Sequence, residues 1–449
     1  MGVGFLDRRS SVAAPNFDRF CVPPAGIAVH LAIGQVYAFS TFNIPLTQLV
    51  GLNHSAPGDW SQPQIVWIFS IAIAALGSSA ALFGRWVERV GPRKSMFVSA
   101  LCFAGGFMVA ALGIRLHLLW LVYAGYGGLG GCGLGIGYIS PVSTLIKWFP
   151  DRPGMATGMA IMGFGGGALI AAPLSVMLMS YFKGPATNGV QETFVAMGAI
   201  YFVFMMIGVL AIRVPPEGWR PAGWVESAKP SSLVTTAHVA ASVAWRTPQF
   251  WLLWGVLCMN VTAGIGVLGV ASPMIQEIFA GRVTAGSAAG FVGLISLFNM
   301  GGRFFWASVS DYLGRRPTYI VFFLLGILLY STVPSIGYGG YIQLFVAAFC
   351  IILSMYGGGF ATIPAYLRDI FGTMEVGAIH GRLLTAWSVA GVLGPVLITK
   401  LREYQIAQGV PKAQAYSVTM YVMCGLLLIG LLCNLSLRPV DPKHHYKPP

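Results

Sequence analysis

Charged side chains are scarce in this sequence. Asp, Glu, Lys and Arg make up 9% of its 449 residues, whereas hydrophobic residues make up 56%. Because a soluble domain carries about a quarter charged residues, this composition excludes a chain that water alone solvates. Acidic residues are rarer than basic ones, with 14 Asp and Glu against 27 Lys and Arg. Most of the chain is therefore expected to lie in a lipid bilayer.

Clustered cysteines are missing as well. The seven cysteines are scattered singly, with no CxxC motif and no Cys/His cluster, which predicts neither a disulfide framework nor a metal site. No expected membrane span carries a nucleophile–base pair or a pair of haem ligands. We therefore expect no cofactor and no catalytic residue, and the chain is not predicted to be an enzyme.

Long apolar runs are what the sequence has instead. Runs of about 20 apolar residues, long enough to cross a bilayer as helices, recur along the whole chain. They lack the alternation of a membrane β-barrel. The predicted fold class is an all-α polytopic membrane protein. The twelve expected spans are 23–48, 64–84, 95–114, 117–140, 155–181, 193–212, 250–277, 286–308, 319–339, 341–363, 380–400 and 416–437.

Cationic residues set the expected orientation. Most lysines and arginines fall before the first span or after even-numbered spans, and cationic loops are retained in the cytoplasm. Both termini are thus expected in the cytoplasm, in a multi-pass protein of the cell (inner or plasma) membrane. These loops account for the net charge of +13 without nucleic-acid binding. The expected segments are a tail 1–22, a six-helix bundle 23–212, a cytoplasmic central loop 213–249, a second six-helix bundle 250–437 and a tail 438–449.

An internal repeat relates the two halves of the chain. The pairs Glu88 and Asp311, Gly91 and Gly314, Arg93 and Arg316, and Gly154 and Gly377 all lie 223 positions apart. This fixed offset indicates duplication into two pseudo-symmetric six-helix halves. Carboxylates and arginines at a tight glycine turn suit a conformational latch that pairs in one state and separates in another. The alternative is that they only mark cytoplasmic loops. The latch residues would be Glu88, Arg89, Arg93, Asp311, Arg315 and Arg316.

Two sets of motifs resemble known transporters. The pattern G-x-x-x-[DE]-R-x-G-x-R-K at 84–94, repeated after the eighth span with Ala307 in place of the first glycine, resembles the signature of the major facilitator superfamily. The stretches 34–46, 138–159, 163–170, 356–367 and 380–395 look like the oxalate/formate antiporter family, which is related to the monocarboxylate carriers. The resemblance covers nearly the whole chain except its tails. It implies the major facilitator fold and a secondary transporter of small carboxylate anions.

Arg303 falls within an expected span, eight residues before Asp311, about 12 Å from the cytoplasmic boundary at a rise of 1.5 Å per residue. A charge at this depth costs at least about 2.5–3.5 kcal/mol, and no Asp or Glu is expected there. Because its planar fork suits a carboxylate, we expect Arg303 to bind the substrate; a structural ion pair is the alternative. The family resemblance implies the same role. Asn299 lies one turn away and would hold the guanidinium, contact the substrate or bond a neighbouring helix.

The resemblance also implies roles in the first and fourth spans. Gln35 and Tyr37 would donate hydrogen bonds to the substrate, and Tyr138 would line its cavity. A packed Tyr37 and an interfacial Tyr138 fit the sequence too. His30 is the titratable group near neutral pH that the sequence places well within a span. It is either a proton-coupling group or a hydrogen-bonded structural histidine.

Trp387 marks a departure from the family. The oxalate carrier of the family has a lysine in this part of the eleventh span, and here Trp387 or a neighbour stands in its place. One deep cation instead of two suits a monocarboxylate better than a dianion, which puts oxalate in doubt and leaves formate, pyruvate and lactate open. Trp387 either closes the cavity beside the substrate or packs in the core.

The function expected from these features is carboxylate transport by alternating access, as anion exchange or facilitated transport. The lack of a deep carboxylate argues against the acidic proton relay of many symporters. A proton-coupled monocarboxylate symporter is the alternative, and a non-transporting carboxylate sensor with the same fold is a second one. The expected partners are a small carboxylate anion and the bilayer, without nucleic acid, and the chain is expected to be monomeric.

Overall fold

The protein is described by a computed structural model over residues 4–52, 54–223, 233–235 and 237–446. Parts of the expected tails and of the expected central loop 213–249 lie outside these residues. The described part is helical throughout and has no β-strand beyond isolated bridges. Twelve segments are long and apolar enough to cross a membrane, which confirms the predicted all-α twelve-span fold.

The spanning segments agree with the expected ones apart from their ends. They are Arg19–Leu46, Gln62–Val90, Pro92–Arg115, Leu119–Trp148, Pro153–Phe182, Val190–Ala211, Pro248–Leu268, Gly286–Leu313, Arg315–Tyr338, Ile342–Phe371, Val376–Ala407 and Ser417–Leu435.

The helices divide into two compact units. Unit 1 comprises 1–151, 159–226 and 375–385, and unit 2 comprises 152–158, 227–374 and 386–449. Each unit therefore contains one short piece of the other half of the chain. The first turns of the fifth span belong to unit 2, and the first turns of the eleventh span belong to unit 1. This exchange brings two candidate latch residues, Glu88 and Asp311, into contact with the starts of the exchanged helices.

Unit 1 packs its long helices around an aromatic core in which Phe107 and Phe194 contact Tyr126. α4 lies against α8, and α3 lies against both α6 and α14. Its helices are η1 (Arg8–Ser11), η2 (Arg19–Cys21), α1 (Pro23–Ile33), η3 (Gly34–Phe42), α2 (Asn43–Leu46), α3 (Gln62–Val90), α4 (Pro92–Arg115), α5 (Leu119–Val122), η4 (Tyr123–Gly130), α6 (Gly131–Trp148), α7 (Pro153–Phe182, from Met159 onward), α8 (Val190–Ala211) and α14 (Val376–Leu383).

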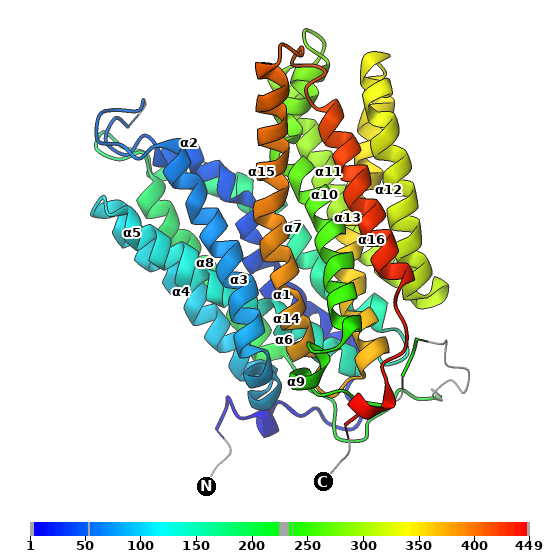
Figure 1. The fold of residues 1–449 in the computed structure, drawn as a ribbon. Helices are drawn as coiled ribbons and strands as arrows, with labels where there is room; N and C mark the ends of the chain where they lie inside the picture. Colours follow the sequence, from blue (N-terminus) through cyan, green and yellow to red (C-terminus); the bar gives the residue numbers. More distant parts are fainter. Residues whose placement is uncertain (1–3, 53, 224–232, 236, 447–449) are drawn as a thin grey trace. The chain divides into compact units, whose positions relative to one another are not determined.

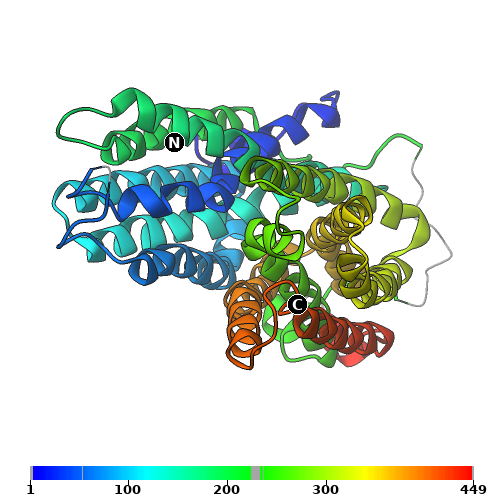
Figure 2. The same ribbon diagram turned by 90° about the horizontal axis from the view of Figure 1, so that it is seen from above.

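Unit 2 pairs α11 with α13 and α12 with α16; α12 (yellow) and α16 (red) lie side by side in both views (Figures 1 and 2). Its helices are the first turns of α7, α9 (Ala241–Ala244), α10 (Pro248–Ile278), α11 (Ala285–Leu313), α12 (Arg315–Tyr338), α13 (Ile342–Phe371), α15 (Thr385–Ala407, from Ala386 onward) and α16 (Ser417–Leu435).

Three spans that carry candidate site residues are not continuous α-helices. The fourth, which carries Tyr138, has a π-helical stretch, η4 (Tyr123–Gly130), between α5 and α6. The first changes at Gly34 from the α-helix α1 to the 3-10 helix η3, which carries Gln35 and Tyr37. The eleventh is interrupted at Leu384, between α14 and α15. Interruptions of this kind are characteristic of transporter spans that line a binding site.

Both copies of the repeated motif make the same turn. α3 ends at Val90, its cap Gly91 has φ 85° and ψ 169°, and α4 begins at Pro92. α11 ends at Leu313, its cap Gly314 has φ 89° and ψ 153°, and α12 begins at Arg315. This region of backbone space is essentially restricted to glycine, so the repeated glycine is required by the turn that presents Glu88 and Asp311.

We predict that Gly314→Ala lowers the thermal unfolding midpoint of the detergent-solubilised protein, because a side chain in this conformation costs about 1–3 kcal/mol. Tryptophan fluorescence during heating measures the midpoint. Gly301→Ala is the matched control: Gly301 lies inside α11 with open space around an added Cβ, and alanine favours a helix interior by about 1 kcal/mol. Equal midpoints for the two variants would contradict the argument.

Candidate functional site

Arg303 in α11 is fully buried in unit 2. Its Nε donates a hydrogen bond to Oδ1 of Asn299, one turn earlier, over 3.3 Å. Its guanidinium carbon lies 5.3 Å from the ring centroid of Phe360 in α13. An arginine remains charged in any protein environment, and these contacts come from a neutral amide and an aromatic face. The structure thus places a buried cation between groups that orient it.

Trp387 in α15 belongs to the same cluster. Its ring centroid is 4.7 Å from that of Phe360, in an edge-to-face arrangement, and its side chain is fully buried. Three helices of unit 2 therefore contribute to the cluster of Asn299, Arg303, Phe360 and Trp387. The sequence had not singled out Phe360, whose apolar ring gives no signal outside its tertiary contacts.

His30 and Tyr138 lie together in unit 1, and both are fully buried. The Nε2 of His30 is 3.1 Å from the backbone carbonyl oxygen of Tyr138. Because a carbonyl oxygen only accepts hydrogen bonds, Nε2 carries the proton in this arrangement. The two rings are 5.3 Å apart, and the ring of Tyr138 is also 5.8 Å from that of His380 in α14. His380 was not expected at the site.

Gln35 and Tyr37 lie on η3 but have different neighbours. Tyr37 is half-buried and contacts the ring of Phe164, which also contacts the ring of Tyr138. Gln35 is fully buried, and its Oε1 accepts a hydrogen bond of 2.9 Å from the hydroxyl of Tyr126. The structure therefore groups Tyr37 with Tyr138 and places Gln35 in the contact with Tyr126.

Glu88 of the first repeat caps the start of α14. Its Oε1 accepts hydrogen bonds from the backbone N–H of Gly377, over 3.0 Å, and from the hydroxyl of Ser143. Lys147 in α6 pairs with the second carboxylate oxygen over 2.6 Å. A carboxylate at a helix N-terminus satisfies backbone donors and interacts favourably with the helix dipole.

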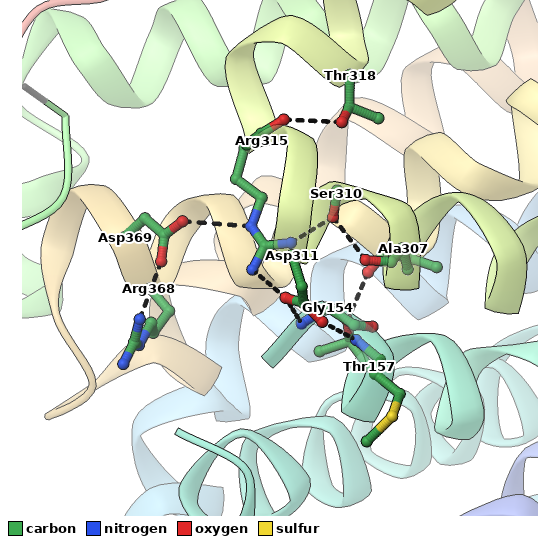
Figure 3. Close-up of polar contacts among 12 residues, drawn as sticks. Gly154, Thr157, Ala307, Ser310, Asp311, Arg315, Thr318, Arg368 and Asp369 are labelled. Atoms are coloured by element: carbon green, nitrogen blue, oxygen red, sulfur yellow. Dashed lines mark hydrogen bonds and ion pairs between the residues drawn. The ribbon is translucent and has the colours of Figure 1, made fainter. Parts of the chain in front are cut away.

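Asp311 of the second repeat caps the start of α7 in the same way (Figure 3). Its two oxygens accept hydrogen bonds of 2.8 Å from the N–H groups of Gly154 and Met155. Arg315 pairs with Asp311 over 2.6 Å and with Asp369 over 3.2 Å. The sequence repeat had matched Gly154 with Gly377, and the structure makes each glycine the partner of the carboxylate from the other repeat.

The remaining arginines of the motif have other contacts. Arg93 donates to the carbonyl oxygen of Ile212 at the end of α8, over 3.4 Å, and to Ser10 and Phe5 near the N-terminus. Arg316 donates to the carbonyl oxygen of Leu435 at the end of α16. Among the described residues neither arginine forms an ion pair. Both place a cation at a helix C-terminus.

Arg89 is exposed, and the described part of the chain contains no ion pair with it. The cations that contact the repeated carboxylates are Lys147 and Arg315. Only Arg315 was expected among the latch residues, because Lys147 lies far from the motif in sequence.

A family model described as Major Facilitator Superfamily matches residues 25–395 and, in a second match, residues 267–449. The chain belongs to the Major Facilitator Superfamily. This confirms the superfamily resemblance seen in the repeated motif. Members of the superfamily are transporters, so this multi-pass membrane protein is a transporter and not an enzyme. Within the described ranges, no group of three His, Cys, Asp or Glu residues is arranged to hold a metal ion.

Named relatives within the superfamily include carriers of small acids. The chain is similar to the oxalate:formate antiporter of Oxalobacter formigenes, with 28% identity over 363 residues that cover 80% of this chain and 79% of the relative. It is also similar to apicoplast pyruvate carrier 1 of Toxoplasma gondii. The identity is 23% over an alignment of 506 positions, which covers 94% of this chain and 89% of the relative.

Among solved structures, the proton:xylose symporter XylE has the same fold. The TM-score is 0.65 at 13% sequence identity, and the alignment covers 94% of this chain and 96% of that one.

We predict that Asp311→Asn lowers the unfolding midpoint in detergent, by the equivalent of about 1–3 kcal/mol. The amide keeps one acceptor oxygen for the start of α7, but it loses the charge that pairs with Arg315, and both of these side chains are 6% exposed. Glu403→Gln is the control, since its pair with Lys400 is 53% and 75% exposed and is worth about 0–1 kcal/mol. A larger loss in the control would refute the ranking.

Proposed function

We propose that this transporter carries small monocarboxylate anions, such as formate, pyruvate or lactate, by alternating access, with Arg303 holding the carboxylate. Anion exchange or facilitated transport fits this arrangement, and proton-coupled symport of the same anions is the alternative. The observation that carries the proposal is the fully buried guanidinium in α11 between the amide of Asn299 and the ring of Phe360. A planar fork of this kind binds a carboxylate through two parallel hydrogen bonds.

The free-energy cost of placing a charge in a membrane span supports a functional role for Arg303. A charge inside a membrane span is expensive, and such residues mark substrate pathways more often than not. The bond from Nε to Asn299 fixes the rotation of the guanidinium, so its outer nitrogens keep a defined direction for an anion. The similarity to two relatives, an oxalate:formate antiporter and a pyruvate carrier, supports a small carboxylate as the substrate.

The neighbourhood of Arg303 favours one carboxylate over two. Trp387 or a neighbour stands where the family's oxalate carrier has a lysine. Trp387 lies beside Phe360 and adds no charge. We propose that Trp387 and Phe360 form the apolar wall against the substrate's carbon end. In unit 1, the hydroxyls of Tyr37 and Tyr138 and the amide of Gln35 are the proposed further donors to the substrate.

The two capped helix starts are the proposed latch. Glu88 on Gly377 and Asp311 on Gly154 each fasten a spanning helix at its first turn, and release of these caps would accompany the change of access. The excess of lysines and arginines after even-numbered spans supports cytoplasmic termini, and the proposed location is the cell membrane.

We expect Arg303→Gln to abolish counterflow of radiolabelled pyruvate, formate and lactate in proteoliposomes, because the amide has no charge to offset desolvation of the anion. Arg303→Lys should retain a small fraction of the activity, since an ammonium cannot form the two-bond fork. The exposed Arg438→Gln, in the C-terminal segment, is the control and should transport normally. Normal counterflow by folded Arg303→Gln would disprove the proposed site.

A second cation should shift the substrate preference. We expect Trp387→Lys to raise the ratio of oxalate to pyruvate counterflow at least about tenfold, the effect of 1.4 kcal/mol of added discrimination. Trp387→Met removes the ring without adding charge and is the matched control, which should leave the ratio near that of the wild type. An equal ratio in both variants would show that charge at this position does not set the preference.

A further inference from the structure

His380 is a buried titratable residue that the proposed carboxylate site does not use. Its side chain is 1% exposed, and neither ring nitrogen has a hydrogen-bond partner among the described residues. A neutral imidazole has one N–H donor and one acceptor nitrogen, and each unsatisfied buried polar group costs about 1–3 kcal/mol. A group kept at this cost is a candidate for a role in another conformational state.

Docking of α14 on α3 seals His380 from water. Gly377 receives the cap from Glu88, and one turn later Gly381 lies so close to Ala80 of α3 that a Cβ at Gly381 would overlap the carbonyl oxygen of Ala80. Arg85 of α3 and Glu375, at the start of α14, form an ion pair over 3.4 Å. These contacts bracket His380, so separation of α14 from α3 would uncap Gly377 and expose the imidazole together.

Among the described residues, no charged side chain forms a hydrogen bond or ion pair with the ring of His380. α1 contributes the imidazole of His30, and α6 contributes the ring of Tyr138. The charged groups of the packed elements are Arg85, Glu88 and Arg89 on α3, Lys147 on α6, and Glu375 and Arg382 beside His380 in its own segment. Glu88 is engaged by Lys147 and Gly377, and Glu375 by Arg85. In the docked arrangement an imidazolium at His380 would lack a counter-ion, so the neutral form is expected.

His30 and His380 differ in how their rings are held. The Nε2 of His30 donates a hydrogen bond to the carbonyl oxygen of Tyr138, which fixes its ring between α1 and α6. Neither ring nitrogen of His380 is hydrogen-bonded among the described residues, and His380 lies on the short helix that ends at Leu383, just before the interruption of the eleventh span. His380 is therefore the histidine whose surroundings change when α14 moves.

We propose that His380 is the proton-binding group that couples carboxylate transport to proton movement, and that docking of α14 on α3 controls its access to water. When α14 undocks, a ring nitrogen of His380 takes a proton from water and the ring becomes a cation. The positive charge on His380 and the negative charge of the carboxylate held by Arg303 cross together in the change of access, and the proton returns to water on the other side. One proton and one monocarboxylate move together, without net charge. This inference rests on the proposed function.

Proteoliposomes containing the full-length protein provide the test, with [14C]pyruvate as the probe. Exchange is measured as counterflow at equal pH on both sides, and coupling as accumulation driven by an alkaline interior, with protein-free liposomes to subtract passive entry. We expect wild-type accumulation to approach tenfold per pH unit, the ratio that corresponds to 1.36 kcal/mol. His380→Gln should retain exchange within about twofold and lose accumulation, because exchange at equal pH requires no net proton transfer. His54→Gln, in an exposed loop, should keep both.

Two results would overturn the proposal. Accumulation by His380→Gln at the wild-type level would show that the proton binds elsewhere. Loss of both exchange and accumulation in folded His380→Gln would assign His380 to substrate binding instead of coupling. Absence of exchange in the wild-type protein for every acid tested would refute the proposed function itself, which is a separate outcome.

A spectroscopic measurement decides on His380 independently of transport. In the 15N-histidine NMR spectrum of the full-length protein in lipid nanodiscs, the His380 signals are those missing from His380→Gln. We expect these signals to move from neutral to imidazolium shifts as the pH falls from 8 to 5 in the presence of pyruvate, with His30 unchanged. A His380 ring that stays neutral throughout would overturn the proposal whatever the transport assays give.

Discussion

The structure depends on the cost of placing charge and backbone polar groups where water is excluded. The two proposed latch carboxylates, Glu88 and Asp311, each pair with a cation and also accept a hydrogen bond from backbone N–H at the start of a helix. Glu88 has Lys147 and Gly377, and Asp311 has Arg315 and Gly154. A charge-assisted bond to an orphan helix donor offsets desolvation of both partners. The same constraint makes Arg303 and His380 informative, because both are buried polar side chains within spans.

The duplication is visible in how the repeats complete one another. Each repeat presents a carboxylate after a glycine turn, and each carboxylate caps a helix that comes from the opposite repeat. As a result 375–385 packs within unit 1 and 152–158 packs within unit 2. The fastenings differ in their cations, since Lys147 comes from α6 and Arg315 lies one turn from Asp311 in the motif itself.

Much of the fold could be predicted because its signals are local. Twenty-residue apolar runs give the spans, and a fixed offset gives the duplication and the glycine turns at Gly91 and Gly314. Arg303 stood out because a charge within an apolar run is conspicuous. His380 did not, because its burial comes from the docking of α14 on α3 and not from its position in the run. The contacts of Arg93 and Arg316 with distant helix ends, and of Gln35 with Tyr126, likewise arise only from tertiary packing.

The contacts of Arg93 and Arg316 bear on the order in which the helices of each repeat assemble. Each arginine lies on the third span of its repeat and donates a hydrogen bond at the end of the sixth, to Ile212 and to Leu435. Because synthesis proceeds from the N-terminus, neither guanidinium can form its hydrogen bond until the final helix of its repeat has left the ribosome. The contact joins the third and sixth spans of each repeat, so in each repeat it forms only after the last of the six spans has been made.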